Sequence, residues 1–181
     1  MIADVAHDPA IAEVLIDEAR LQARVRELAR EIERDYAGKD PVLVGLLRGS
    51  IVFLADLLRH LDIAVTVDLL AISSYFGRDS SGVVRLLKDL DHPIAGRHVL
   101  IVEDIIDTGL TLNYVLRSLR TRGPESLEVC TLLDKPARRL IDLDLKYVGF
   151  PIPDVFVVGY GLDYNQRYRN LSFLGVLRVE E

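Results

Sequence analysis

The chain has 181 residues, of which 50% are hydrophobic and 28% are charged, and its formal net charge is −6 at pH 7. This length and composition are typical of a globular domain and exclude a disordered chain. The net negative charge argues against a protein that coats nucleic acid, which needs a basic face.

The sequence lacks the features of an exported or membrane protein. Its first residues have neither a basic start nor a long apolar run, so we expect no signal peptide. No apolar run approaches the roughly 18 residues that span a bilayer. We therefore expect a cytoplasmic protein without membrane association. The single cysteine, Cys130, is interpreted as a small buried hydrophobic residue.

A strand and a long amphipathic helix are expected first along the chain. Residues 11–16 form a strand-like run. A helix is expected after Asp17, because apolar side chains then recur at helical spacing. The residues that mark its buried face are Leu21, Val25, Leu28 and Ile32.

A second strand and a second helix follow. The run PVLVGLL, residues 41–47, is continuous and apolar, which is typical of a strand buried on both faces. The turn Arg-Gly-Ser then leads into a helix that Ser50 is expected to cap. The residues expected on its buried stripe are Ile51, Leu54, Leu57, Leu58 and Leu61.

The rest of the chain continues this alternation. One further helix is expected, with Leu112, Val115, Leu116 and Leu119 inward, and Gly123-Pro124 ends it. A polar loop flanked by glycines is expected at residues 76–82. The remaining strands are expected at residues 63–75, 83–87, 99–102, 126–133, 154–160 and 171–177.

Strands that alternate with helices over this length predict an α/β fold with a mainly parallel sheet flanked by helices. The N-terminal strand and the C-terminal segment do not fit the alternation, so we expect them to form a small subdomain beside the sheet. No repeat or linker interrupts the sequence, and a single domain over residues 1–181 is expected. Open α/β sheets bind ligands at the carboxyl ends of their strands. The polar clusters at such ends are residues 48–50, 103–111, 134–135 and 159–169.

The segment VLIVEDIIDTGLTL, residues 99–112, combines carboxylates with a small-residue turn. Its second half opens a helix, where unpaired N–H groups and the helix dipole suit a phosphate, and Gly109 allows close approach of a ligand. Its acidic half, which contains Glu103, Asp104 and Asp107, suits sugar hydroxyls or a Mg²⁺-bound ligand. A ribose 5-phosphate with free hydroxyls satisfies both halves.

Other interpretations of this segment are weaker. Asp-Thr-Gly is also the signature of aspartic proteases, but those enzymes are β-rich and pair two such motifs. Here a helix follows the motif, and it occurs once. The Gly-x-Gly-x-x-Gly pattern of a dinucleotide-binding site is absent. A solvated acidic loop with a turn glycine is the remaining alternative.

Several blocks resemble one enzyme family. Residues 99–112 closely resemble the phosphoribosyl-pyrophosphate (PRPP) signature of type I phosphoribosyltransferases. The run DVFVVGYGLDYNQRYRNL, residues 154–171, is similar to the C-terminal motif of the hypoxanthine-guanine phosphoribosyltransferases. Residues 43–57, 73–75 and 132–139 resemble other blocks of that family, in its order. The likeness, to the bacterial type of the family, extends from about residue 14 to residue 176.

The resemblance implies the type I phosphoribosyltransferase fold, with a small hood subdomain built from the N- and C-terminal segments. It implies purine salvage: with Mg²⁺, the phosphoribosyl group passes from PRPP to hypoxanthine or guanine, giving IMP or GMP and pyrophosphate. The expected partners are these small molecules and further copies of the chain, in a homodimer or homotetramer, with no nucleic acid.

Two alternatives stay open at this point. One is a sister enzyme that favours guanine or xanthine. The other is a PRPP-sensing regulator that binds RNA and uses this fold without turnover. The negative net charge and the presence of Asp107 and Lys135 argue against the regulator.

Residue roles follow from the same resemblance. Asp107 would act as a general base or acid near N7 of the purine. Glu103 and Asp104 would face the ribose hydroxyls, directly or through Mg²⁺. The 5′-phosphate would be held by Thr108, Gly109 and Thr111.

Two arginines and a glycine are assigned to pyrophosphate: Arg48, Gly49 and Arg169. In the family the peptide bond before the position of Arg48 is often cis. Asp163 would help to hold a second Mg²⁺.

The remaining assignments concern the base and a lid. Lys135 follows a strand and offers donors to the oxygen at C6 of a 6-oxopurine. Phe156 would stack on the purine, and backbone groups of Val157 would bind its edge. Ser74 and Tyr75 would begin a loop that closes over the site. Two neighbouring charged residues, Asp134 and Arg138, are interpreted as surface residues.

Overall fold

Helices and strands alternate along the computed structural model, which describes residues 8–74 and 84–178. The elements of the first half are β1 (Ile11–Ile16), α1 (Glu18–Tyr36), β2 (Val42–Leu47), α2 (Ile51–His60), β3 (Thr66–Ser74) and β4 (Val84–Lys88). Those of the second half are β5 (His98–Ile106), α3 (Leu110–Arg120), β6 (Ser126–Asp134), a 3₁₀ helix (Pro136–Arg138), β7 (Tyr147–Pro151), β8 (Val157–Val158) and β9 (Leu174–Leu177).

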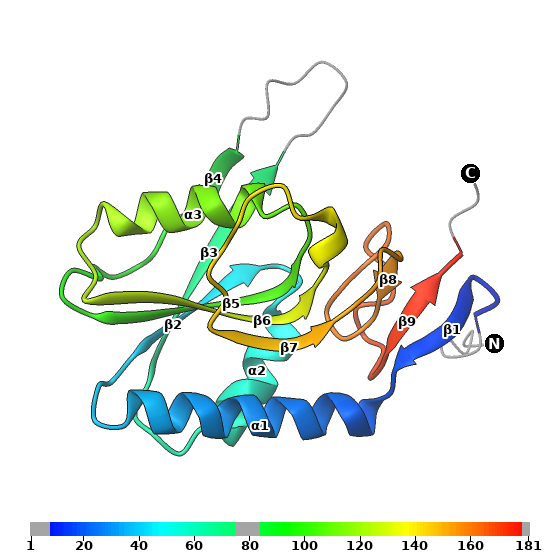
Figure 1. The fold of residues 1–181 in the computed structure, drawn as a ribbon, viewed down its shortest axis with the longest axis horizontal. Coiled ribbons are helices and arrows are strands. Elements are labelled where there is room, and N and C mark those ends of the chain that lie inside the picture. Colours follow the sequence, from blue (N-terminus) through cyan, green and yellow to red (C-terminus); the bar gives the residue numbers. More distant parts are fainter. Residues whose placement is uncertain (1–7, 75–83, 179–181) are drawn as a thin grey trace.

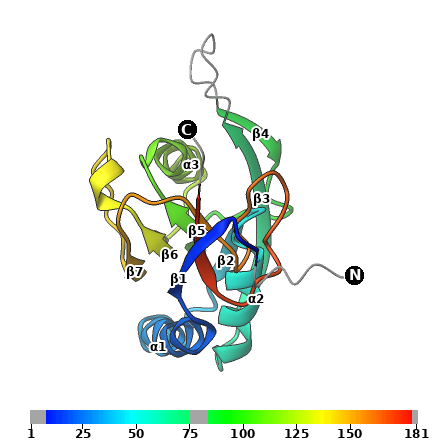
Figure 2. The same cartoon turned by 90° about the vertical axis from the view of Figure 1, so that its right-hand side faces the viewer.

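The main sheet has six strands in the order β4-β3-β2-β5-β6-β7. All neighbours pair in parallel except β3 and β4, which are antiparallel. Helices α1 and α2 cover one face of this sheet and α3 covers the other (Figures 1 and 2). The expected α/β architecture with a mainly parallel sheet is confirmed.

The central strands are buried on both faces, as their continuous apolar runs predicted. In β2, Val42 and Val44 pack on the side of α3, whereas Leu43 packs on the side of α1 and α2. In β5, Leu100 and Ile101 divide between the two faces in the same way. This alternation follows from the two-residue period of a strand.

Helical spacing correctly predicted the buried faces of α1 and α3. Asp17 is the N-cap of α1, and its side chain accepts a hydrogen bond from the amide of Arg20 at 2.8 Å. The predicted residues that are at most 4% exposed in the two helices are Leu21, Val25, Leu28, Ile32, Leu112, Val115, Leu116 and Leu119.

The expected buried stripe of α2 was partly wrong. Ile51 is 50% exposed, and Phe53 is buried in its place beside Leu54 and Leu57. Ser50 precedes the helix, but its hydroxyl donates to the carbonyl of Leu46 and does not cap α2. The hydroxyl turns back toward β2 because Ser50 is itself in a helical conformation and fully buried.

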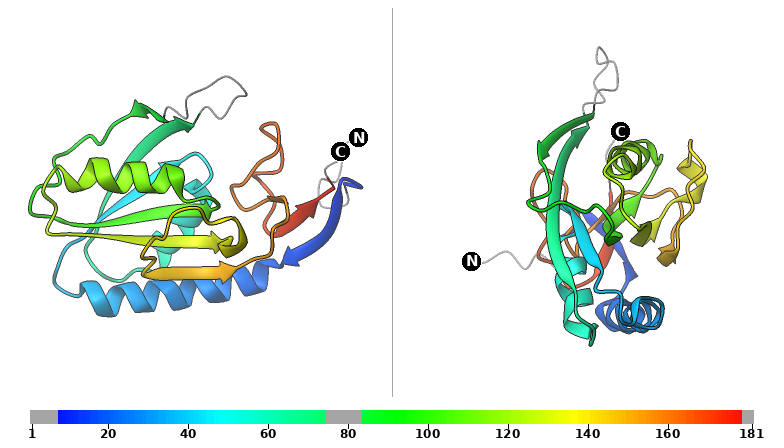
Figure 3. Two further views of the ribbon diagram at one scale, coloured as in Figure 1. Left: turned by 45° about the horizontal axis from the view of Figure 1, so that its top comes forward. Right: turned by 90° about the vertical axis from the view of Figure 1, so that its left-hand side faces the viewer.

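A second sheet, of three strands in the order β1-β9-β8, forms the small subdomain expected from the two ends of the chain. We call it the hood. It lies beyond the carboxyl ends of the main parallel strands (Figures 1 and 3). Strand β8 is much shorter than the expected strand at 154–160. Gly159, with φ of 100°, and Tyr160, with φ of 50°, turn the chain out of the extended conformation.

Strand β7 at the edge of the main sheet was not predicted from the sequence. It is only five residues long and contains Gly149 and Pro151, which weaken the pattern of a strand. Gly149 is required by packing, because a Cβ there would overlap the backbone of Leu132 in β6.

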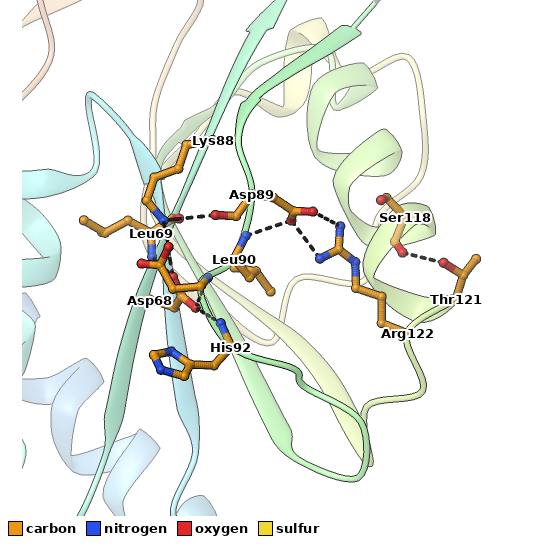
Figure 4. A network of polar contacts seen from close by, with 10 residues as sticks. Asp68, Leu69, Lys88, Asp89, Leu90, His92, Ser118, Thr121 and Arg122 are labelled. Atoms are coloured by element: carbon orange, nitrogen blue, oxygen red, sulfur yellow. Dashed lines mark hydrogen bonds and ion pairs between the residues drawn. The ribbon is translucent and has the colours of Figure 1, made fainter.

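A polar network holds the opposite edge of the main sheet (Figure 4). Asp68 of β3 is 5% exposed and accepts hydrogen bonds from the amides of Leu69 and Asp91. Arg122, after α3, donates two hydrogen bonds to Asp89, at 2.7 and 3.0 Å. These contacts tie β3 and the end of α3 to the segment after β4. The buried carboxylate of Asp68 requires such donors, whereas the pair of Asp89 and Arg122 lies at the surface.

Cys130 is buried in β6, as expected, and is a free thiol. Across residues 8–74 and 84–178, the helices are all too short or too polar to cross a membrane.

Candidate active site

A cavity of about 460 Å³ lies where the parallel strands end and the hood begins. Segments that are distant in the sequence contribute to its walls, among them the ends of β2, β5 and β6 and the stretch from residue 156 to residue 169, which includes β8. The predicted site residues that line it are Arg48, Gly49, Glu103, Asp104, Asp107, Thr111, Lys135, Phe156, Val157, Asp163 and Arg169. An adjoining cavity of about 230 Å³ contains Thr108 and Gly109.

Glu103 and Asp104 lie near the carboxyl end of β5, which continues to Ile106. The Oε2 atom of Glu103 is buried and has no hydrogen-bond partner in the described part of the chain. Burial and the neighbouring charge of Asp104 raise the pKa of Glu103 well above its ordinary value. Burial also raises the pKa of Asp104 to about 6. Two neighbouring carboxyl groups, one of which has an oxygen without a partner among the described residues, suit a ligand that brings hydroxyl groups or a cation.

The turn after β5 leads into α3 through Gly109, whose φ of 82° explains the glycine. The amide of Leu110 approaches the hydroxyl oxygen of Thr108 at 3.4 Å. Because the first amides of a helix have no partners within it, the start of α3 presents N–H donors and the positive end of the helix dipole to the adjoining cavity. This geometry suits a phosphate group.

At the end of β2, the peptide bond between Leu47 and Arg48 is cis, as the family resemblance implied. Gly49 follows it, and its Cα lies so close to Asp104 that a Cβ would overlap that carboxylate. The loop after β2 therefore touches the acidic end of β5 directly, and no side chain fits between them.

The C-terminal motif brings the two predicted pyrophosphate arginines together through Gln166. Its Oε1 atom accepts from Arg48 at 3.0 Å and lies 3.4 Å from Arg169. Arg169 also forms an ion pair with Asp163 at 2.6 Å and donates to the carbonyl of Gly161. Two guanidinium groups held side by side form a site for a polyanion.

Two contacts fasten this motif to the loop after β2 and to α2. Gly161, with φ of 101°, packs on the carbonyl of Gly49, and a Cβ at this position would overlap that oxygen. The hydroxyl of Tyr160 donates to Asp56 of α2 at 2.6 Å. The hood and the loop after β2 are therefore held in one arrangement around the cavity.

The wall near Lys135 has the character of a base-binding site. Lys135 is 6% exposed, and its Nζ atom lies 4.0 Å from Oδ1 of Asp154, its ion-pair partner. Phe156 is 43% exposed, with Tyr164 against it edge-to-face at 5.6 Å between ring centroids. Val157 is buried in β8. An exposed aromatic face beside a buried ammonium group can hold a flat, polar ring.

The phosphoribosyl transferase domain model matches residues 13–165. The chain belongs to the phosphoribosyltransferase family.

Relatives of this phosphoribosyltransferase span nearly its whole length. It is 53% identical over 173 residues to the hypoxanthine phosphoribosyltransferase of Escherichia coli, covering 93% of this chain and 97% of that protein. It is 51% identical over 174 residues to the hypoxanthine-guanine phosphoribosyltransferase of Mycobacterium avium, covering 92% and 86%.

Solved structures agree with the fold of this phosphoribosyltransferase. The crystal structure of a hypoxanthine phosphoribosyltransferase from Staphylococcus aureus matches with a TM-score of 0.92 at 45% identity, covering 98% of this chain and 97% of that chain. A hypoxanthine-guanine phosphoribosyltransferase from Bacillus anthracis, with a HEPES molecule in the active site, matches with a TM-score of 0.89 at 49% identity, covering 93% and 99%. These matches confirm the expected type I fold.

The acidic end of β5 in this phosphoribosyltransferase fits Mg²⁺. The unpartnered Oε2 of Glu103 is a hard oxygen ligand. No three acidic, histidine or cysteine side chains converge as a metal site within residues 8–74 and 84–178. The fit is therefore to an ion shared between one or two carboxylates and substrate phosphates, which is how Mg²⁺ is usually held.

The two residues predicted to begin the lid lie at the edge of the described part of the chain. Ser74 is the last residue of β3, and Tyr75 lies outside the described residues, together with the rest of the expected lid loop up to residue 83. The other predicted site residues all line the two adjoining cavities.

Of the two residues interpreted as surface residues, Arg138 is exposed as expected but also contacts a site residue, whereas Asp134 is not exposed. Arg138 lines the cavity, and its Nε atom lies 3.1 Å from Oδ1 of Asp107. Asp134 is largely buried and paired with Arg139. The spacing of Arg138, three residues after Lys135, was the available signal, because one turn of a 3₁₀ helix brings such residues to the same side. Gln166 was also missed, although it lies within the C-terminal motif.

Proposed function

We propose that this phosphoribosyltransferase transfers the 5-phosphoribosyl group of PRPP to hypoxanthine and guanine, forming IMP or GMP and pyrophosphate. The observation that carries the proposal is the buried ammonium group of Lys135 in the same cavity as the β5 carboxylates and the paired arginines. One cavity thereby offers groups suited to a 6-oxopurine, a ribose and a polyphosphate. The names of the relatives from several bacteria support the same reaction.

The residues fit the charge that develops in this reaction. When the bond from C1 of the ribose to pyrophosphate breaks, positive charge builds on the ribose ring. Glu103 and Asp104, at the end of β5, would stabilise that charge. Arg48 and Arg169, held by Gln166, would donate to the departing pyrophosphate. Mg²⁺, held by Glu103 and Asp104, with Asp163 at a second ion, would offset the negative charge of the phosphates.

The other end of the cavity would orient the base. Lys135 would donate to the oxygen at C6, Phe156 would stack on the ring and the backbone of Val157 would bind the ring's edge. Asp107 would accept or return the proton at N7 as the new glycosidic bond forms. Thr108, Gly109 and Thr111 would hold the 5′-phosphate at the N-terminus of α3.

A panel of bases tests the proposal. The protein is incubated with PRPP, Mg²⁺ and hypoxanthine, guanine, xanthine or adenine in turn, and the nucleotides formed are identified. We expect IMP and GMP. Formation of AMP as the main product, or of no nucleotide at all, would contradict the proposal, and a dominance of GMP or XMP would identify a sister enzyme.

The same preparation tests two further expectations. We propose a homodimer or homotetramer, which light scattering after size-exclusion chromatography measures. An RNA-binding regulator is not favoured by the net charge of −6. A salt-dependent shift in the gel mobility of RNA on addition of the protein, without pyrophosphate release, would instead identify such a regulator.

A further inference from the structure

Four charged side chains form a continuous series of ion pairs along the base end of the cavity. The Nε atom of Arg138 lies 3.1 Å from Oδ1 of Asp107, and its other end, Nη1, lies 3.4 Å from Oδ1 of Asp154. The same oxygen of Asp154 lies 4.0 Å from Nζ of Lys135. Arg138 thus connects the proposed proton acceptor to the carboxylate that neighbours the proposed base-binding lysine.

Backbone hydrogen bonds fix the position of this series of ion pairs. Lys135 precedes the 3₁₀ helix after β6 and Arg138 is its last residue, and the amide of Arg138 donates to the carbonyl of Lys135 at 3.1 Å. The amide of Lys135 donates to the carbonyl of Ile106, at the end of β5, at 2.9 Å. The amide of Leu140 donates to the carbonyl of Thr108 at 3.0 Å. The segment that carries Arg138 is therefore bonded on both sides to the loop that carries Asp107.

The contact between Arg138 and Asp107 leaves one oxygen of the carboxylate able to accept a hydrogen bond. The Oδ1 atom of Asp107 is buried, yet it accepts no aligned hydrogen bond from the described residues, because the N–H of Arg138 does not point at it. The guanidinium group holds the carboxylate by charge and by contact. The hydrogen-bonding capacity that remains is available to an N–H group of a ligand in the cavity.

The stability of the fold does not explain this arrangement. Arg138, Asp107 and Asp154 are each between 43% and 51% exposed at the side chain. Ion pairs at such exposure contribute little to the free energy of unfolding. These ion pairs instead fix the orientation of the side chains, which matters because the reacting groups of an enzyme must be held close to a productive geometry.

We propose that Arg138 is a positioning residue that orients the carboxylate of Asp107 toward the base, and that Asp154 holds Arg138 in place from the other side. This inference rests on the proposed function, because Asp107 is the group on which Arg138 would act. It predicts that Arg138 affects the chemical step through Asp107 and has no effect of its own on the binding of PRPP.

The test is a double-mutant cycle in single-turnover measurements with PRPP and hypoxanthine. Arg138→Ala should lower the rate of nucleotide formation about tenfold and leave the KM for PRPP within about twofold. In the Asp107→Asn background the same substitution should have no further effect, because its target is already removed. Arg138→Lys, which keeps the charge, should restore most of the rate.

The control is Arg122→Ala, which removes a two-bond pair with Asp89 at the opposite edge of the sheet and should leave the rate unchanged. Circular dichroism checks that each variant is folded. An equal loss in the wild-type and Asp107→Asn backgrounds, or a normal rate in Arg138→Ala, would overturn the role of Arg138 while the proposed function stands. A wild-type protein that forms no nucleotide would overturn the proposed function, and this inference with it.

Discussion

Gly49 and Asp104 lie in direct contact, although one follows β2 and the other lies in β5. The Cα of Gly49 is so close to the carboxylate of Asp104 that any Cβ would overlap it. The glycine is therefore required by the neighbouring side chain, and the position of each residue depends on the other.

Gly49→Ala should displace the carboxylate of Asp104 and lower kcat/KM for PRPP by about 10²-fold, the order of loss that a displacement of about 1 Å can produce. Steady-state kinetics with varied PRPP measure this. Gly123→Ala is the control, because it places alanine at a φ of 69° after α3, away from the cavity and in open space, and so adds backbone strain without any contact with Asp104. An unchanged kcat/KM in Gly49→Ala would show that the contact has no role in PRPP binding.

Asp107→Asn should lower kcat by about 10²–10⁴-fold, the range of general acid–base catalysis. The affinity for PRPP should stay within about tenfold, because Asp107 lies on the base side of the ribose-binding carboxylates. The measurement is kcat under conditions where chemistry limits turnover. An unchanged kcat there would remove Asp107 from the mechanism.

Arg169→Ala should raise the KM for PRPP by about tenfold or more, and raise it more than the KM for the base, because a guanidinium contact with a phosphate is lost. Arg167→Ala is the matched control, since this neighbouring arginine is exposed and does not line the cavity. If the KM for the base alone rises in Arg169→Ala, the assignment of Arg169 to pyrophosphate is wrong.

Lys135→Ala should cause a large loss of activity with hypoxanthine, and the wild-type protein should discriminate against adenine by about 10⁴–10⁵-fold in kcat/KM. Adenine carries an amino group where hypoxanthine carries an oxygen, so the buried ammonium group would meet a donor. Lys146→Ala is the control, because Lys146 lies over the rings of Tyr36 and Tyr147, away from the cavity. Efficient formation of AMP would contradict the assignment of Lys135.

The ligand-free protein should lose stability as the pH rises between about 4 and 7 through the carboxyl groups of β5. Burial raises the pKa of Asp104 to about 6, so the folded state binds more protons than the unfolded state in this range. The stabilising contribution is complete below the pKa of the unfolded state and is lost as the pH rises through the folded pKa. Because Asp104 is half-buried, we expect its ionisation to lower the free energy of unfolding by about 1–2 kcal/mol across this range.

Urea unfolding in EDTA at about pH 5 and about pH 7.5 measures this difference. Asp104→Asn should reduce the fall in the free energy of unfolding between the two pH values, because the replaced group no longer ionises. Mg²⁺ with PRPP should stabilise the wild-type protein at the higher pH by mass action. Equal pH dependence in the two proteins would show that Asp104 ionises freely in the folded state.

Features that depend on local spacing could be predicted from the sequence. The faces of α1 and α3 follow from helical periodicity, and the turn at Gly109 follows from a small residue between a buried strand and a helix. The carboxyl ends of parallel strands meet at one edge, so the convergence of Glu103, Lys135 and Arg48 also followed from the order of elements. These signals are local or topological and do not require coordinates.

Only the tertiary structure decided which side chains touch across that edge. Gln166 accepts from Arg48, 118 residues away, and Arg138 contacts both Asp107 and Asp154 although its side chain is half exposed. Such pairings depend on how the hood and the loops after β2 and β6 pack, within fractions of an ångström, and no spacing along the chain encodes them. The sequence by itself determined the family, the fold class and most cavity residues, whereas the contacts that orient those residues were decided by packing between distant segments.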